Sequence, residues 1–129
     1  MKIVLDTSGY CASDLGSESA LDALETADQI FLPSVAYGEL YYGFKNGSRF
    51  SKNATRLDGF IKTFAIQIIA VDLDVARIYG DIFAFLKSKG KPIPTNDIWI
   101  AASCLSVGGL LLTSDQHFRV IDTMQLRLV

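Results

Sequence analysis

Short runs of apolar residues alternate along this chain with longer stretches in which apolar positions recur every three or four residues. The short runs predict buried strands at residues 2–6, 29–32, 66–71 and 109–113, with residues 118–121 as a candidate short fifth strand. The longer stretches predict helices at residues 17–27, 34–45, 50–64, 75–89 and 95–107. Strands that alternate with helices favour an α/β fold, with a central, mostly parallel sheet of four to five short strands and helices on both faces. The polar residues 6–9 after the first strand predict a turn.

The chain is predicted to form one domain. It has 129 residues without an internal repeat, a low-complexity tract or a linker, so residues 1–129 are treated as one unit. Half of the residues are apolar, which is enough to bury a core. Twelve basic and fourteen acidic residues give a formal net charge of −2, which argues against a polybasic protein that binds through bulk charge. This balance still allows a nucleic-acid enzyme whose own site is built from acids.

The lengths of the apolar runs bear on the location of the protein. The first run stops at Asp6, too early for a signal peptide, and no run approaches the roughly 20 residues that a membrane span needs. Cys11 and Cys104 are far apart in a chain with one histidine, so neither a disulfide scaffold nor a cysteine metal site is indicated. We therefore expect a cytoplasmic protein with two reduced cysteines and no membrane partner.

Acidic residues fall where open parallel sheets form ligand sites, at the carboxyl ends of strands. Asp6 ends the first predicted strand and Asp115 follows the fourth, so both are expected at the same edge of the sheet. Each of them alone is equally well explained as a turn residue. Asp97 lies in the first turn of the last helix, where the helix dipole favours an acid, but it shares its face with apolar residues. An unsatisfied polar group in such surroundings costs about 2–7 kcal/mol, which favours a functional role for Asp97.

Other polar residues are weaker candidates on their own pattern. Glu39 lies off the apolar stripe of its helix and is interpreted as an exposed glutamate. His117 follows Asp115 without a paired nucleophile and is interpreted as a polar surface residue. The sequence shows no Ser-His-Asp arrangement and no glycine-rich phosphate loop.

Four segments carry a more specific signal when they are taken in order. They are Leu5-Asp6-Thr7, Tyr37-Gly38-Glu39-Leu40, the run from Pro92 to Ala102, and the run from Thr113 to Phe118. Together they resemble the PIN-domain ribonucleases, and most closely the VapC-type toxins of toxin–antitoxin pairs. The run from Pro92 to Ala102 is the most specific, and the resemblance extends from the first strand to the end of the chain.

The resemblance implies a single acidic pocket for Mg²⁺ or Mn²⁺, formed by Asp6, Glu39, Asp97 and Asp115. Within this pocket we expect Asp6 and Asp97 to be the principal metal ligands and Asp115 to complete the site, while Glu39 orients the attacking water or binds through it. Magnesium is a hard ion that prefers carboxylate oxygens, so this set of residues suits it.

Two positions around this pocket depart from the pattern of the family. Ser114 stands where an arginine is often found, and Ser8 stands where an asparagine is frequent. Hydrogen-bond support for the pocket is implied for Thr113 or Ser114. The two departures bear on substrate contacts and on pocket support, whereas all four acids are intact.

The function implied by the resemblance is a metal-dependent endoribonuclease that hydrolyses RNA and leaves a 5′-phosphate and a 3′-hydroxyl. It also implies a cognate antitoxin as partner and a homodimer. Aromatic residues on two helices offer apolar surface for a dimer, although core packing is the simpler interpretation: Tyr37, Tyr41, Tyr42, Phe83 and Phe85.

Two other classes of function stay open from the sequence. A phosphoacceptor or phosphatase domain also places an aspartate after its first strand, but the Asp-x-Asp pattern is interrupted by Ser8. A non-catalytic PIN-like binding module would keep the fold without the chemistry. The intact acids argue against such a module. A titration with divalent metal ions distinguishes it from the nuclease, because the absence of metal binding would favour the module.

Overall fold

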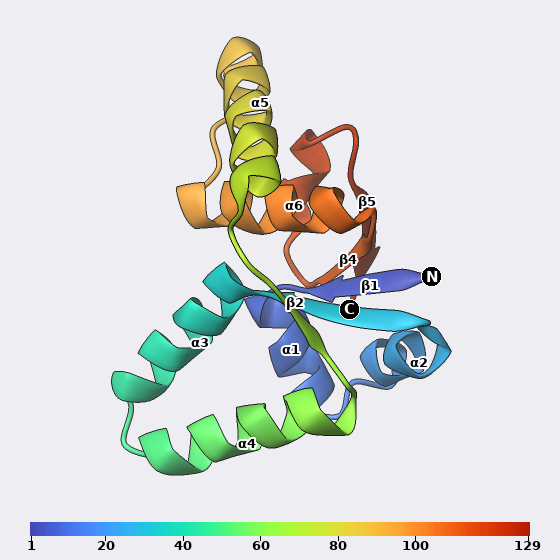
Figure 1. Cartoon of the computed structure of the whole chain (residues 1–129), viewed down its shortest axis with the longest axis vertical. Coiled ribbons are helices and arrows are strands. Elements are labelled where there is room, and N and C mark those ends of the chain that lie inside the picture. Colours follow the sequence, from blue (N-terminus) through green and yellow to red (C-terminus); the bar gives the residue numbers. More distant parts are fainter.

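The computed structural model describes residues 1–129 and contains one five-stranded sheet with helices on both sides (Figure 1). The strand order is β3-β2-β1-β4-β5, and every neighbouring pair is parallel. The strands are β1 (Lys2–Leu5), β2 (Gln29–Pro33), β3 (Gln67–Ile69), β4 (Leu110–Thr113) and β5 (Gln125–Leu128). The helices are α1 (Thr7–Asp14), α2 (Glu18–Thr26), α3 (Ser34–Lys45), α4 (Phe50–Thr63), α5 (Leu73–Lys89), α6 (Thr95–Val107) and the 3-10 helix η1 (Gln116–Val120). The predicted α/β fold is therefore confirmed.

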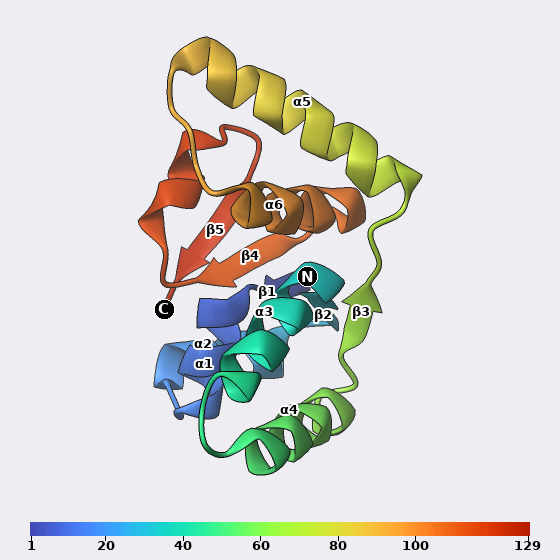
Figure 2. The same cartoon turned by 90° about the vertical axis from the view of Figure 1, so that its left-hand side faces the viewer.

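The helices form two layers that enclose the sheet. Helices α5 and α6 lie on one side, and α1, α2 and α4 lie on the other (Figure 2). Helix α3 contacts both α1 and α6, so it connects the two layers beside the ends of the strands. None of the helices combines the length and apolar character needed to cross a membrane.

The central strands form the middle of the hydrophobic core. Ile3, Val4 and Leu5 of β1 are fully buried because β2 and β4 flank this strand and helices cover both faces. Leu111 and Leu112 of β4 are buried for the same reason. A continuous apolar run is the signature of such a strand, which is why β1 and β4 were predictable from the sequence.

The prediction for the end of the chain was wrong. Residues 118–121 do not form a strand, because Gln116–Val120 form η1 and the fifth strand is Gln125–Leu128. Phe118 and Ile121 are buried as single anchors of this irregular segment. Strand β5 lies at the edge of the sheet and alternates exposed and half-buried residues, which is a weaker signal than a continuous apolar run.

The turn predicted at residues 6–9 is the start of helix α1. Asp6 caps this helix, and its side chain accepts the backbone N–H of Gly9. The buried face of α1 consists of Gly9, Tyr10 and Ser13, so small and polar residues replace the apolar stripe that would identify a helix. Helix α1 was missed for this reason.

Gly9 lets helix α1 approach strand β4 closely. A Cβ atom at this position would lie 2.1 Å from the backbone oxygen of Leu112. Because the neighbour is backbone, it cannot move aside without shifting the strand. The first turn of α1 and the end of β4 are thereby held together, next to Asp6.

We expect Gly9→Ala to destabilise the protein by about 1–3 kcal/mol, since the added methyl group overpacks the contact between α1 and β4. Chemical denaturation measures the free energy of unfolding. Gly59→Ala is the matched control, because a Cβ at Gly59 of α4 meets nothing within 4 Å and the change should stabilise the helix by up to about 1 kcal/mol. Equal unfolding free energies for Gly9→Ala and the wild type would contradict the close approach.

Candidate active site

Acidic side chains from four elements converge at the carboxyl edge of the sheet. Asp6 follows β1 and Asp115 follows β4, and these two strands are parallel neighbours, so their ends meet. Asp97 lies in the first turn of α6. Glu39 lies on α3, the helix that contacts both layers. The places of Asp6 and Asp115 follow from the rule that ligand sites form at the carboxyl ends of parallel strands. Asp97 and Glu39 reach this edge through the packing of α6 and α3.

Asp6 is buried, with 4% of its surface exposed, and its carboxylate accepts three hydrogen bonds. Oδ1 accepts from the backbone N–H of Gly9 at 2.6 Å and from the hydroxyl of Ser8 at 2.7 Å, while Oδ2 accepts from the hydroxyl of Thr113 at 2.5 Å. A carboxylate has about four acceptor positions, so Asp6 keeps little free capacity. Its orientation is therefore fixed by the protein.

Two opposing effects act on the pKa of Asp6. Burial raises the pKa of the carboxyl, and the negative charge of Asp97 adds to this increase. The hydrogen bonds from Thr113, Gly9 and Ser8 lower it, but burial prevails.

The hydroxyl groups of Ser8 and Thr113 also hold the loop after β4. Each hydroxyl has one hydrogen, which it donates to Asp6, so its oxygen is free to accept. Thr113 Oγ1 accepts the backbone N–H of Asp115 at 3.0 Å, and Ser8 Oγ accepts that of Ser114 at 3.0 Å. Of the two residues expected to support the pocket, Thr113 does so through its side chain and Ser114 through its backbone.

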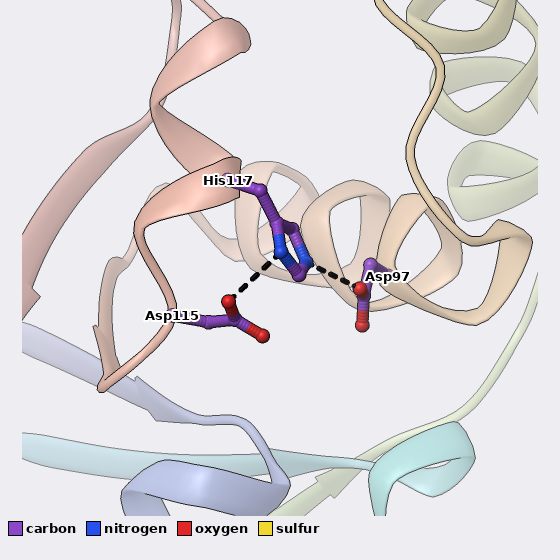
Figure 3. Close-up of side chains that lie close together, drawn as sticks. All are labelled: Asp97, Asp115 and His117. Carbon is purple, nitrogen blue, oxygen red and sulfur yellow. Dashed lines mark hydrogen bonds and ion pairs between the residues drawn. The ribbon is translucent and has the colours of Figure 1, made fainter.

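The ring of His117 lies between Asp97 and Asp115 (Figure 3). Nε2 is 2.6 Å from Oδ2 of Asp97, and Nδ1 is 2.8 Å from Oδ1 of Asp115. Each ring nitrogen of His117 therefore contacts a different carboxylate. The interpretation of His117 as a surface residue was wrong, because its half-buried ring joins two of the candidate acids.

Part of the contact of His117 follows from local spacing. Its place two residues after Asp115, in a short helical turn, brings the two side chains together. The contact with Asp97 depends on the packing of η1 against α6, so the local sequence does not predict it. Only the proximity to Asp115 was therefore open to prediction.

Glu39 is half-buried rather than exposed, contrary to the interpretation from its helix pattern. Its Oε1 accepts a hydrogen bond from the hydroxyl of Thr7 at 3.1 Å. Thr7 directly follows Asp6, so this bond links α3 to the first turn of α1. Glu39 also lines one cavity together with Thr7 and Asn96, the residue before Asp97.

The structure groups some of the expected metal ligands more closely than others. One potential ligand atom each from Asp97, Asp115 and His117 lies within 4.8 Å of the other two. Asp6 lies outside this group, and most of its acceptor positions are occupied by hydrogen bonds from the protein. Ligation of a metal by Asp6 stays a prediction.

Similarity to known proteins was found at the level of family, sequence and structure. A family model described as "PIN domain" matches residues 3–124. Ribonuclease VapC5 of Mycobacterium tuberculosis is 29% identical over 119 residues, which cover 92% of this chain and 87% of that protein.

Two solved structures cover nearly the whole chain. VapBC2 from Rickettsia felis, bound to a DNA fragment from its promoter, has a TM-score of 0.88 and 25% identity, over 99% of this chain and 98% of that chain. VapBC-5 of M. tuberculosis, a member of the VapBC family of toxin–antitoxin systems, has a TM-score of 0.74 and 26% identity, over 99% and 97%. The likeness therefore includes the order of all the elements that carry the acids.

The raised pKa of Asp6 predicts how the stability of the metal-free protein depends on pH. The contribution of this group to stability is present below the ordinary pKa of 3.8 and is lost as the pH rises through its raised folded value. Asp6→Asn removes this loss, so the stability of the variant relative to the wild type should increase with pH. The increase is about 1.4 kcal/mol for each unit by which the pKa is raised.

Urea unfolding in EDTA, at pH values from about 4 to 7, measures this difference. Asp22→Asn, which changes an exposed carboxyl on α2, serves as the control and should show no comparable trend. A difference between Asp6→Asn and the wild type that does not change with pH would contradict the role of burial.

Proposed function

The chain belongs to the PIN-domain family, and on this premise we propose that it is a metal-dependent endoribonuclease, the toxin of a type II toxin–antitoxin pair. The observation that carries the proposal is the group of Asp97, Asp115 and His117 at the carboxyl edge of the sheet, beside buried Asp6, which shares the hydroxyl of Thr113 with the backbone of Asp115. Curated relatives named VapC ribonucleases support RNA as the substrate. An acid-lined site with no cysteine ligand is also what a hard ion needs.

The residues present fit Mg²⁺ or Mn²⁺. Asp97 and Asp115 offer carboxylate oxygens close to one ring nitrogen of His117. Clustered carboxylates repel one another, and the charge of Asp97 already disfavours the charged form of Asp6, so a cation would relieve this repulsion. We propose Asp6, Asp97 and Asp115 as the ligands.

A divalent ion, when bound, supplies a water of lowered pKa and a positive charge that offsets the charge of the phosphate. Asp97 and Asp115 hold this centre against the end of the sheet, and the donors around Asp6 keep its carboxylate in one orientation. Glu39, fixed by the hydroxyl of Thr7, orients the attacking water and accepts its proton. The water oxygen would bond to phosphorus as the bond to O3′ breaks; O3′ would take up a proton from solvent and Glu39 would release its own to solvent, which leaves a 5′-phosphate and a 3′-hydroxyl.

The environment of Asp6 also weighs against a phosphoacceptor domain. In such a domain the carboxylate itself attacks phosphorus and must be accessible. Asp6 is 4% exposed and accepts three hydrogen bonds, so one of its roughly four acceptor positions is left for a metal ion, and neither oxygen is open to attack a phosphate. These contacts suit a ligand held in one orientation better than a nucleophile.

Asp97→Asn should reduce RNA cleavage by more than about 100-fold, beyond the loss typical of a residue that only supports a ligand. The assay incubates purified protein with a pool of structured RNA and Mg²⁺ or Mn²⁺, with EDTA as the metal control. Asp22→Asn should cleave as the wild type does, and circular dichroism checks that each variant is folded.

Full activity of Asp97→Asn would contradict the assignment of this residue. A wild-type protein that binds neither Mg²⁺ nor Mn²⁺ in a calorimetric titration would favour the alternative, a non-catalytic PIN-like binding module. Metal-dependent cleavage that is lost both in EDTA and in Asp97→Asn supports the nuclease.

We also propose a cognate antitoxin and a homodimer as partners. The likeness to VapBC-5, a toxin–antitoxin system, supports the antitoxin. Exposed rings support a dimer surface: Tyr41 (40% exposed) and Phe83 (41%), whereas Tyr37 and Phe85 are half-buried. Tyr42 is not assigned to this surface, because it lines a cavity with Glu39.

Sedimentation at micromolar concentration should show a dimer, which Phe83→Ser weakens if α5 contributes to the contact. Phe83 packs edge to face against Tyr79 of its own helix, so the folded state of the variant is checked by circular dichroism. A wild-type protein that remains monomeric at this concentration would contradict the dimer.

A further inference from the structure

An open cavity of about 600 Å³ lies beside the candidate acids. This volume is within the range of roughly 300–1,000 Å³ that is usual for small-molecule sites. The cavity adjoins the candidate site, since its lining includes Glu39 and its hydrogen-bond partner Thr7, together with Asn96, the residue before Asp97. We call it the α3 cavity; its lining residues are Thr7, Val35, Gly38, Glu39, Tyr42 and Asn96.

One face of helix α3 forms most of the lining. Val35, Gly38, Glu39 and Tyr42 are spaced by three, one and three residues, so they share a face of the helix. Gly38 lies in the middle of this face, and a Cβ there would meet nothing within 4 Å. The absence of a side chain at Gly38 keeps the cavity open.

Tyr42 differs from the other tyrosines of α3. Tyr37 and Tyr41 stack on each other, and Tyr41 also packs against Phe50. Tyr42 forms no ring pair within the protein and is 69% exposed, although it lies one turn from Glu39. An exposed aromatic ring beside an acidic site is a surface on which a planar group can stack.

The chemistry of the lining selects a nucleobase over a phosphate. No lysine or arginine lines the α3 cavity, so no side chain there would hold a phosphate through an ion pair. The amide of Asn96 can instead donate to and accept from a base edge or a ribose hydroxyl. A base can enter only if it is unstacked, which requires an unpaired nucleotide.

We propose that the α3 cavity binds the base of one unpaired nucleotide of the RNA substrate, next to the phosphate that is cleaved. The base stacks on Tyr42, and Asn96 contacts its edge. This inference rests on the proposed ribonuclease function and adds to it a contact with a base.

The test compares three variants with the wild type. Tyr42→Ala removes the stacking surface, Tyr42→Phe keeps it, and Gly38→Leu fills the cavity. Gly38 has an ordinary helical backbone, and leucine has a higher helix propensity than glycine, so this change should preserve the fold. Gly59→Leu on α4 is the matched control, since Gly59 is also helical, faces open space and lies outside the cavity.

The probe is a pool of random-sequence, single-stranded RNA oligonucleotides, and fluorescence anisotropy in EDTA measures binding without turnover. Tyr42→Ala and Gly38→Leu should bind about 5- to 100-fold more weakly, the range expected for one lost base–aromatic stack. Tyr42→Phe and Gly59→Leu should stay within about twofold of the wild type. The slope of affinity against salt should not change, because no phosphate contact is removed.

A second probe, an abasic ribose-phosphate chain, separates base binding from phosphate binding. The wild type should prefer RNA to this chain, and Tyr42→Ala should lose that preference to the same degree as it loses affinity. Unchanged RNA binding by Tyr42→Ala and Gly38→Leu would overturn the inference, and it is also the result expected if the cavity serves a protein partner. An equal loss in Gly59→Leu, or a lower salt slope in Tyr42→Ala, would overturn it as well.

The cleavage assay distinguishes failure of this inference from failure of the proposed function. If the wild type cleaves RNA in a metal-dependent manner while Tyr42→Ala and Gly38→Leu bind as the wild type does, only the base contact is wrong. If the wild type neither binds the RNA pool nor cleaves RNA, both proposals are overturned.

Discussion

The buried carboxylate of Asp6 is the constraint on which the site depends. A buried acid is tolerated only if hydrogen bonds satisfy it, and here the three donors come from two segments: Ser8 and Gly9 in the first turn of α1 and Thr113 at the end of β4. The oxygens of Ser8 and Thr113 in turn accept the backbone N–H groups of the next two residues after β4. The position of Asp115 is thus a consequence of satisfying Asp6, since the same hydroxyl serves both residues.

The site also concentrates negative charge, and the groups of the protein offset only part of it. Burial and the charge of Asp97 both raise the pKa of Asp6, and the hydrogen bonds offset only part of this effect. His117 is the one basic side chain in contact with Asp97 and Asp115. Such an arrangement is costly for a purely structural core, and it favours a site that takes up a positive charge.

Much of the fold was predictable because the central strands are continuous apolar runs, as β1 and β4 demonstrate. Helix α1 was not predicted, because its buried face includes Gly9 and Ser13 in place of apolar residues. Gly9 is buried by its close contact with β4 and not by hydrophobicity. Strand β5 was missed because an edge strand that alternates exposed and half-buried residues lacks the continuous run.

The candidate acids also differ in how far the sequence predicts them. Asp6 and Asp115 follow from the rule for strand ends, and Asp97 was singled out by its apolar helix face. Glu39 was a candidate only through the family resemblance, because its place beside Thr7 depends on the packing of α3 against α1. The contact between His117 and Asp97 is likewise tertiary, so the sequence carries no trace of it.

Two glycines serve opposite physical purposes on either side of the acids. Gly9 lacks a side chain so that α1 can press against β4, which makes the cluster around Asp6 rigid, whereas Gly38 lacks one where nothing fills the space. The proposed function explains why one glycine allows close packing and the other leaves a cavity open. Acids that act on a phosphate contact a group that is the same in every nucleotide, so they carry no sequence information. A preference for one nucleotide at the cleaved position requires contact with its base, and the α3 cavity offers an exposed aromatic ring for that contact beside Glu39.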